Sequence, residues 1–99
     1  IVIDNNVVEV CTDKGISVGE SSKPTIINNQ ISSCSIGIAV KDSSQAWAEG
    51  NTITHSRTGI SAYQKKLFFG GGYATSTNNV FEGVQTEIFA DQLSKVVEL

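Results

Sequence analysis

The stretch Asn29-Gln30-Ile31, followed by Gly37-Ile38-Ala39-Val40, returns about 22 residues later as Asn51-Thr52-Ile53 and Gly59-Ile60-Ser61-Ala62, a period typical of solenoid proteins. A related unit, Gly15-Ile16-Ser17-Val18, stands one period earlier. Within each unit, apolar residues alternate with small or polar ones, as they do in a strand with one buried face. The repeat therefore predicts coils of short strands, each coil burying the face that its neighbour leaves open.

Aligned on this period, the chain forms rows of equivalent residues. The asparagine row comprises Asn6, Asn29, Asn51 and Asn79. An apolar row comprises Val8, Ile31, Ile53 and Phe81. A row of small residues comprises Cys11, Cys34, Ser56 and Val84. Asparagine tolerates the left-handed backbone conformation of a sharp bend. Stacked asparagine side chains can also hydrogen-bond to one another as a ladder. We therefore expect a bend at each asparagine of this row.

A third strand precedes each asparagine, and every row keeps the same order from coil to coil. Hairpins would reverse that order, so neighbouring strands must be parallel. The sequence predicts an all-β fold, a parallel β-helix (a solenoid) of about four and a half coils with about 22 residues and three short strands per coil. Each coil then rises by one inter-strand spacing, about 4.8 Å.

The pattern Asn-x-Ile followed by Gly-Ile-x-Val, over residues 5 to 91, resembles the repeat of right-handed parallel β-helix proteins. This pectate-lyase-like superfold includes families described as carbohydrate-binding and sugar-hydrolase repeats. The resemblance implies a right-handed coil, in agreement with the general preference for right-handed crossovers. It implies no single activity, because the superfold hosts lyases, glycosidases, epimerases, tailspikes, adhesins and assembly factors. It favours an extracellular or cell-surface location, which the residues alone leave undecided.

The length predicts one domain over residues 1–99. Because the chain opens with Ile1 in a predicted strand and contains no Met, we expect a fragment or the C-terminal part of a longer β-helix. One coil carries about six extra residues, which predicts an insertion loop at about 64–77. Either this aromatic and basic loop grips a sugar or a partner, or Leu67 and Phe68 tuck into the core. The second interpretation is favoured.

Cys11 and Cys34 share a row, so their Cα atoms should lie about 4.8 Å apart, within disulfide range. Side chains on in-register parallel strands stand side by side, however, which strains a disulfide. We therefore favour reduced thiols that act as small apolar residues.

The composition argues against several classes of partner. The net charge is −3 and Arg57 is the sole arginine, so a nucleic-acid surface is not expected. No apolar stretch approaches the roughly 20 residues that span a bilayer, and we expect no membrane partner. No spacing of Cys, His, Asp or Glu predicts a metal site, and no motif predicts a cofactor.

Two carboxylates are the best candidates for catalysis. Glu20 and Asp42 occupy the same row of neighbouring coils, about 5 Å apart, a gap suited to glycoside hydrolysis. Both lie in serine-rich turns, where such residues are ordinary turn formers. The lone His55 should face outward and is not favoured as a catalytic group. A fragment of a polysaccharide lyase or glycoside hydrolase is therefore the alternative interpretation.

Trp47 offers a different chemistry, because it should project outward between the inward Ala46 and Ala48. An exposed indole ring resembles the flat platforms that stack on sugar rings. The predicted ligand-binding residues are Trp47, Tyr63, Lys41, Asp42 and Tyr73. We interpret the chain as a non-catalytic scaffold module that binds carbohydrate, such as a polysaccharide, or a protein surface. Apolar coil ends predict a homo-oligomer formed through Ile1, Ile3, Val96, Val97 and Leu99.

Overall fold

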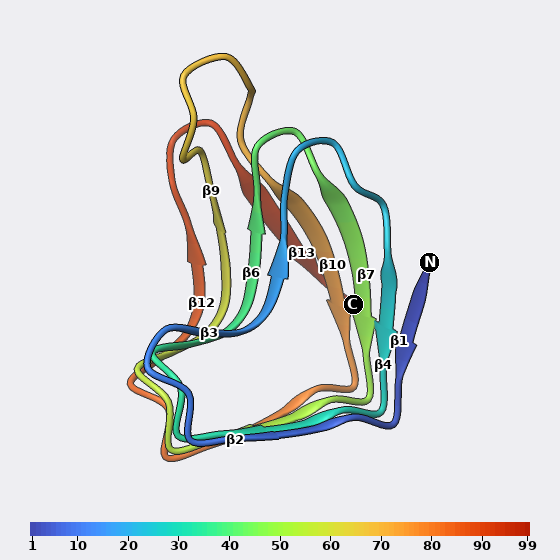
Figure 1. Cartoon of the computed structure of the whole chain (residues 1–99), viewed down its shortest axis with the longest axis vertical. Coiled ribbons are helices and arrows are strands. Elements are labelled where there is room, and N and C mark those ends of the chain that lie inside the picture. Colours follow the sequence, from blue (N-terminus) through green and yellow to red (C-terminus); the bar gives the residue numbers. More distant parts are fainter.

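The computed structural model describes all 99 residues and consists of thirteen β-strands without a helix (Figure 1). Sheet A contains β1 (Val2–Asp4), β4 (Thr25–Ile27), β7 (Gln45–Glu49), β10 (Tyr73–Thr77) and β13 (Lys95–Glu98). Sheet B contains β2 (Val7–Glu9), β5 (Gln30–Ser32), β8 (Thr52–Thr54) and β11 (Val80–Glu82). Sheet C contains β3 (Lys14–Val18), β6 (Ile36–Lys41), β9 (Thr58–Tyr63) and β12 (Thr86–Ala90). Since the chain forms no helix, none crosses a membrane.

The chain passes through sheets A, B and C in turn, so each coil contributes one strand to each sheet. All strand pairs are parallel and keep the predicted register: Ile38 lies beside Ile60, and Ile31 beside Ile53. Four complete coils are followed by β13, the first strand of a fifth. The predicted all-β parallel β-helix with three strands per coil is confirmed.

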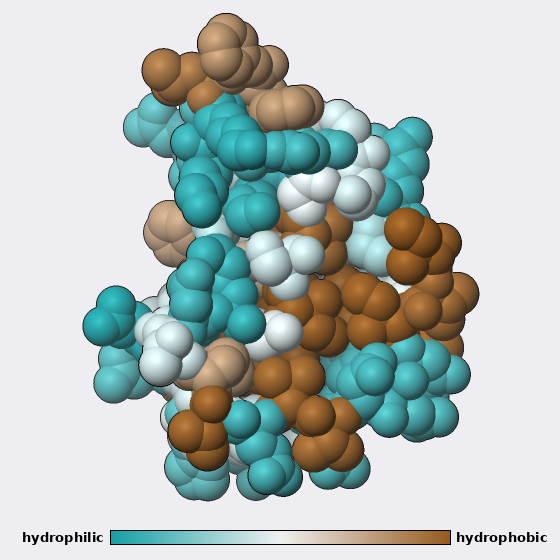
Figure 2. All heavy atoms as spheres, viewed as in Figure 1, coloured by the Kyte–Doolittle hydropathy of each residue, from teal (hydrophilic) through white to brown (hydrophobic).

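The inward side chains fill the coil from end to end. The largest fully buried apolar residues are Ile26, Ile31, Ile38, Ile53, Ile60 and Val40. The glycine row lies where coils approach too closely for a side chain: a Cβ on Gly37 would lie 2.8 Å from the carbonyl oxygen of Gly59. Viewed down the coil, apolar residues gather at the centre of the end coil and continue to its right-hand edge, between hydrophilic groups above and below (Figure 2).

The bend between sheets A and B differs from the prediction in one respect. The left-handed conformation belongs to the residue before each row asparagine, namely Asn5, Asn28, Gly50 and Asn78, with φ of 57°, 56°, 67° and 53°. The expectation that the row asparagines adopt it is wrong, because their side chains must point into the coil. The bend between sheets B and C repeats this conformation at Val10, Ser33, His55 and Gly83.

The row asparagines form the predicted hydrogen-bonded ladder. Asn51 Oδ1 accepts from both the backbone N and the Nδ2 of Asn29, each at 3.0 Å. Asn51 Nδ2 donates to the carbonyl oxygen of Ile26 at 3.0 Å and to Asn79 Oδ1 at 2.9 Å. Asn6 donates in the same way to Asn29. The ladder therefore joins the coils at the bend, where the strand ladders are interrupted.

We expect Asn51→Ala to lower the free energy of unfolding by about 3 kcal/mol, because it leaves buried backbone and side-chain groups of Asn29 and Ile26 without partners. Urea unfolding followed by circular dichroism measures this change. The matched control is Asn6→Ala at the exposed end of the ladder, which should cost about 1 kcal/mol or less. Equal losses of unfolding free energy in the two variants would contradict a stabilising role for the buried part of the ladder.

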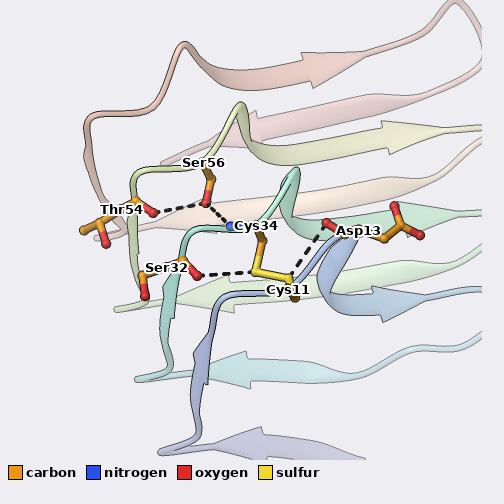
Figure 3. Close-up of a disulfide and its surroundings, with 6 residues drawn as sticks. All are labelled: Cys11, Asp13, Ser32, Cys34, Thr54 and Ser56. Carbon is orange, nitrogen blue, oxygen red and sulfur yellow. Dashed lines mark hydrogen bonds between the residues drawn. A yellow bond between two sulfur atoms is a disulfide. The ribbon is translucent and has the colours of Figure 1, made fainter.

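Cys11 and Cys34 form a disulfide between the first and second coils, which corrects the expectation of reduced thiols (Figure 3). Their Cα atoms lie 4.7 Å apart, as the shared row predicted. Both cysteines follow the second bend and lie outside the strands, so their side chains are not held side by side as they would be in a sheet. In the third coil Ser56 takes this position, and its Oγ accepts from the Cys34 backbone N at 3.2 Å (Figure 3).

The C-terminal part of the chain departs from the regular repeat in two places. The chain ends in the additional strand β13, which pairs with β10 and packs Val96 against the core. The insertion loop covers residues 64–72, not 64–77, because Tyr73–Thr77 form β10. The expectation that Leu67 and Phe68 tuck into the core is wrong, since they are 90% and 98% exposed.

Candidate functional site

The outer face of sheet A carries two aromatic side chains on neighbouring strands. Trp47 lies between two inward alanines of β7, points outward as predicted and is 40% exposed. Tyr73 of β10 is 54% exposed. Trp47 lies beside Thr75 and Tyr73 beside Gln45, so the two aromatic residues are diagonal neighbours across the strand pair. We call the surface formed by Trp47, Tyr73, Gln45, Thr25 and Thr75 the aromatic face.

Two shallow hollows lie on the aromatic face, and both include Gln45 and Thr75. The first is lined by Gln45, Ala46, Tyr73, Ala74, Thr75 and Val97. The second is lined by Lys23, Pro24, Thr25, Gln45, Ala46, Trp47 and Thr75. Each hollow therefore combines one aromatic side chain with amide and hydroxyl groups that can donate or accept hydrogen bonds.

The aromatic face has a hydrogen bond from its indole ring and basic side chains along one margin. Trp47 Nε1 donates to Glu49 Oε1 at 2.9 Å, two residues along the same strand. This bond uses the edge of the indole, so the exposed part of the ring remains open to contact. Lys95 lies beside Tyr73 on β13, and Lys23 lines the second hollow, so one margin of the face is basic.

Lys41, Asp42 and Tyr63 lie apart from the aromatic face, at the end of sheet C and in the following turn. Lys41 of β6 lies beside Tyr63 of β9. Asp42 is fully buried, and its Oδ1 accepts from the backbone N–H groups of Lys65 and Lys66, each at 2.8 Å. The Asp42 carboxylate therefore anchors the insertion loop and is not available at the surface. The structure brings Trp47 and Tyr73 together but separates them from these three residues.

The acidic side chains of this turn have structural partners, although Asp42 Oδ2 is buried without a hydrogen bond. Burial opposes the ionisation of Asp42, but the backbone N–H groups of Lys66 and Lys65 outweigh it and lower its pKa. Glu20 forms an ion pair with Lys66, and this hydrogen bond lowers the pKa of Glu20. Burial raises the pKa of the Tyr63 hydroxyl. The two carboxylates of this row are thus ionised and engaged, and they do not face an open cleft together.

A family model described as "Right handed beta helix region" matches residues 1–97. The chain belongs to the right-handed β-helix family. No curated protein and no solved structure matches it. The family establishes that the chain is a β-helical scaffold, and it confirms the right-handed coil that the resemblance implied.

Some residues of the aromatic face escaped the sequence pattern. The extra residues of this coil hide the register of β10, so the repeat places Tyr73 in the loop and does not pair Thr75 with Trp47. A signal was present, because Ala74 and Ser76 alternate around Thr75 as two alanines do around Trp47. His55 occupies a bend, and no group of three or more His, Cys, Asp or Glu side chains is placed to hold a metal ion.

We expect Asp42→Asn to destabilise the β-helix at pH 7 by about 1 kcal/mol, because it removes the charge that strengthens two backbone hydrogen bonds. The folded-state pKa of Asp42 is lowered. Its contribution is therefore present above the unfolded-state value of about 4 and is lost as the pH falls through the folded-state pKa. The urea midpoints of the wild type and of Asp42→Asn should converge at acidic pH. The exposed control Asp4→Asn should leave the midpoint unchanged at both neutral and acidic pH. A constant difference from pH 7 to pH 2 would contradict the assignment.

Proposed function

We propose that this β-helix is a non-catalytic module that binds an extended polysaccharide along its aromatic face. The observation that carries the proposal is the pair of exposed aromatic side chains, Trp47 and Tyr73, on neighbouring parallel strands. A regular sheet face holds such side chains rigidly and leaves them open to a long ligand. Nothing in this arrangement requires the ligand to be enclosed.

The chemistry of a sugar ring matches both kinds of group on this face. A pyranose has apolar C–H faces, which pack on an aromatic ring, and a rim of hydroxyl groups, which need donors and acceptors. The hollows beside Trp47 and Tyr73 supply Gln45, Thr25 and Thr75 for that rim. A protein surface would favour a larger contact area with a dry apolar centre, which shallow hollows lined by hydroxyl and amide groups do not provide.

The alternative, a fragment of a polysaccharide lyase or glycoside hydrolase, rested on the carboxylates of Glu20 and Asp42. Glycoside hydrolysis needs two carboxyl groups that face each other across the scissile bond. Asp42 is buried and Glu20 is paired with Lys66, so this pair gives no support to the enzyme interpretation. We therefore develop the binding function.

We expect Trp47→Ala and Tyr73→Ala each to weaken polysaccharide binding about tenfold, the effect of losing one stacking contact worth about 1.4 kcal/mol. Affinity electrophoresis in gels that contain neutral or acidic polysaccharides measures this retardation. Phe89→Ala is the matched control, because Phe89 is 46% exposed on the outer side of sheet C. Unchanged retardation of both aromatic-face variants, or an equal loss in the control, would refute the site. Release of new reducing ends or unsaturated products would refute the non-catalytic assignment.

We also propose that the module self-associates through its end coils, as the apolar ends suggested. The inward residues of the end coils, including Ile3, Val8, Phe81, Ile88 and Val96, are only partly buried, whereas those of the middle coils are fully buried. Each end also leaves one edge of every sheet unpaired, and unpaired edges favour the addition of further strands.

Sedimentation velocity tests this second proposal. The sedimentation coefficient should rise with concentration, and the variants Ile3→Lys and Val96→Lys should lower the association at least tenfold by placing a charge on each end, a change of about 1.4 kcal/mol or more. Circular dichroism controls for folding of the variants. A protein that sediments as a monomer at all concentrations would overturn the proposal.

A further inference from the structure

The insertion loop at residues 64–72 presents two apolar side chains that pack against nothing. Leu67 is 90% exposed and Phe68 is 98% exposed, the largest exposed fractions among the apolar side chains at this end of the molecule. The loop forms the furthest point of the molecule along its longest axis (Figure 1). A space-filling view shows apolar side chains at this extremity above a hydrophilic band (Figure 2).

The base of the loop is held by several hydrogen bonds, so the tip is presented in one place. Asp42 Oδ1 accepts two backbone N–H groups at the start of the loop, as described above. Gln64 Nε2 donates to the carbonyl oxygen of Phe69 at 2.6 Å and closes the loop across its neck. The Gly70 backbone N donates to Ser43 Oγ at 2.7 Å, and the Gly72 backbone N donates to Ser94 Oγ at 2.9 Å. The fold therefore builds a support for a tip that contributes nothing to the core.

The charged side chains that directly precede the tip are both basic, although the whole chain is acidic. Lys65 and Lys66 directly precede the two apolar residues. Glu20, the exposed acid beside them, is neutralised by its ion pair with Lys66. Asp42 is buried. Lys65 is therefore the exposed charged side chain beside Leu67 and Phe68 that has no ion-pair partner, while the buried Asp42 carboxylate is turned toward the backbone of the loop.

We propose that this tip contacts the interfacial region of a lipid bilayer that contains anionic lipids. Leu67 and Phe68 enter the boundary between headgroups and acyl chains, and Lys65 lies among the lipid phosphates. Apolar and aromatic side chains beside lysine are the combination that suits this boundary. The expectation of no membrane partner rested on the lack of a spanning segment, and this contact requires none.

The size and shape of the tip favour a bilayer over a protein partner. A stable protein interface buries about 800 Å² on each partner, whereas an aromatic side chain buries about 150–250 Å². Two side chains above a hydrophilic band fall well short of a protein interface. A bilayer accepts a small convex tip without a matching pocket, and several weak contacts add together when a module is present in many copies.

Sedimentation with vesicles tests the proposal directly. The protein should pellet with vesicles of phosphatidylcholine and phosphatidylserine, and less with phosphatidylcholine alone. The double variant Leu67→Ser, Phe68→Ser should lose binding at least about tenfold, and Lys65→Gln should lose the preference for phosphatidylserine. Phe89→Ser, which removes an exposed aromatic ring elsewhere, should bind like the wild type. No binding of the wild type, or an equal loss in the Phe89 variant, would overturn the proposal.

Fluorescence locates the contact, because the chain contains a single tryptophan, Trp47. In a Trp47→Phe background, Phe68→Trp places the only indole at the loop tip, and its emission should shift to the blue when phosphatidylserine vesicles are added. An emission spectrum unchanged by vesicles that pellet the protein would overturn insertion of the tip. Capture of the tip by a soluble protein without any vesicle binding would also overturn it. The variant Leu67→Ser, Phe68→Ser should still bind polysaccharide through the aromatic face. Failure of the membrane contact can therefore be distinguished from failure of the proposed polysaccharide site.

Discussion

Every coil of this protein hydrogen-bonds to the next through its backbone, and this in-register stacking governs the strands, the bends and the interior alike. A parallel ladder of this kind requires each coil to have nearly the same path as its neighbours, so that a residue always lies over its equivalent. The strands meet the constraint by regular pairing. At the bend between sheets A and B, backbone bonds such as that from Asn28 N to the carbonyl oxygen of Glu49 continue the stacking, and the asparagine ladder adds hydrogen bonds from side chains. Asn29 and Asn51 are buried because the ladder runs inside the coil.

The same constraint separates the interior from the faces. Inward positions must fill a narrow space, so most of them hold small or branched residues or the ladder asparagines, with Phe81 in an end coil as an exception. Outward positions on the sheets carry no such demand, and they can vary without affecting the stack. Trp47 and Tyr73 occupy such free positions. A β-helix can therefore acquire a binding face by changing outward residues while the scaffold remains the same.

The turns between sheets C and A can also vary in length, because the spacing between coils does not fix it. The third coil uses this freedom for the insertion loop, and the adjoining turn of the second coil supplies Asp42 and Ser43 to hold the loop in place. Here an acidic side chain that resembled half of a catalytic pair has a structural task. The arrangement also explains why Leu67 and Phe68 can project into solvent, since backbone hydrogen bonds at the base hold the loop without any core packing.

The repeat of glycine, asparagine and apolar rows was enough to predict the fold, because it has one arrangement that buries the inward apolar rows together. It also determined that Trp47 faces outward, since strand alternation leaves no other choice between two buried alanines. The folded structure was needed to establish the oxidation of Cys11 and Cys34, because that depends on how side chains leave the backbone just after a bend. It alone decided the burial of Asp42 and the place of Tyr73 beside Gln45, because an insertion interrupts the repeat and its path follows from contacts between coils, which no local pattern encodes.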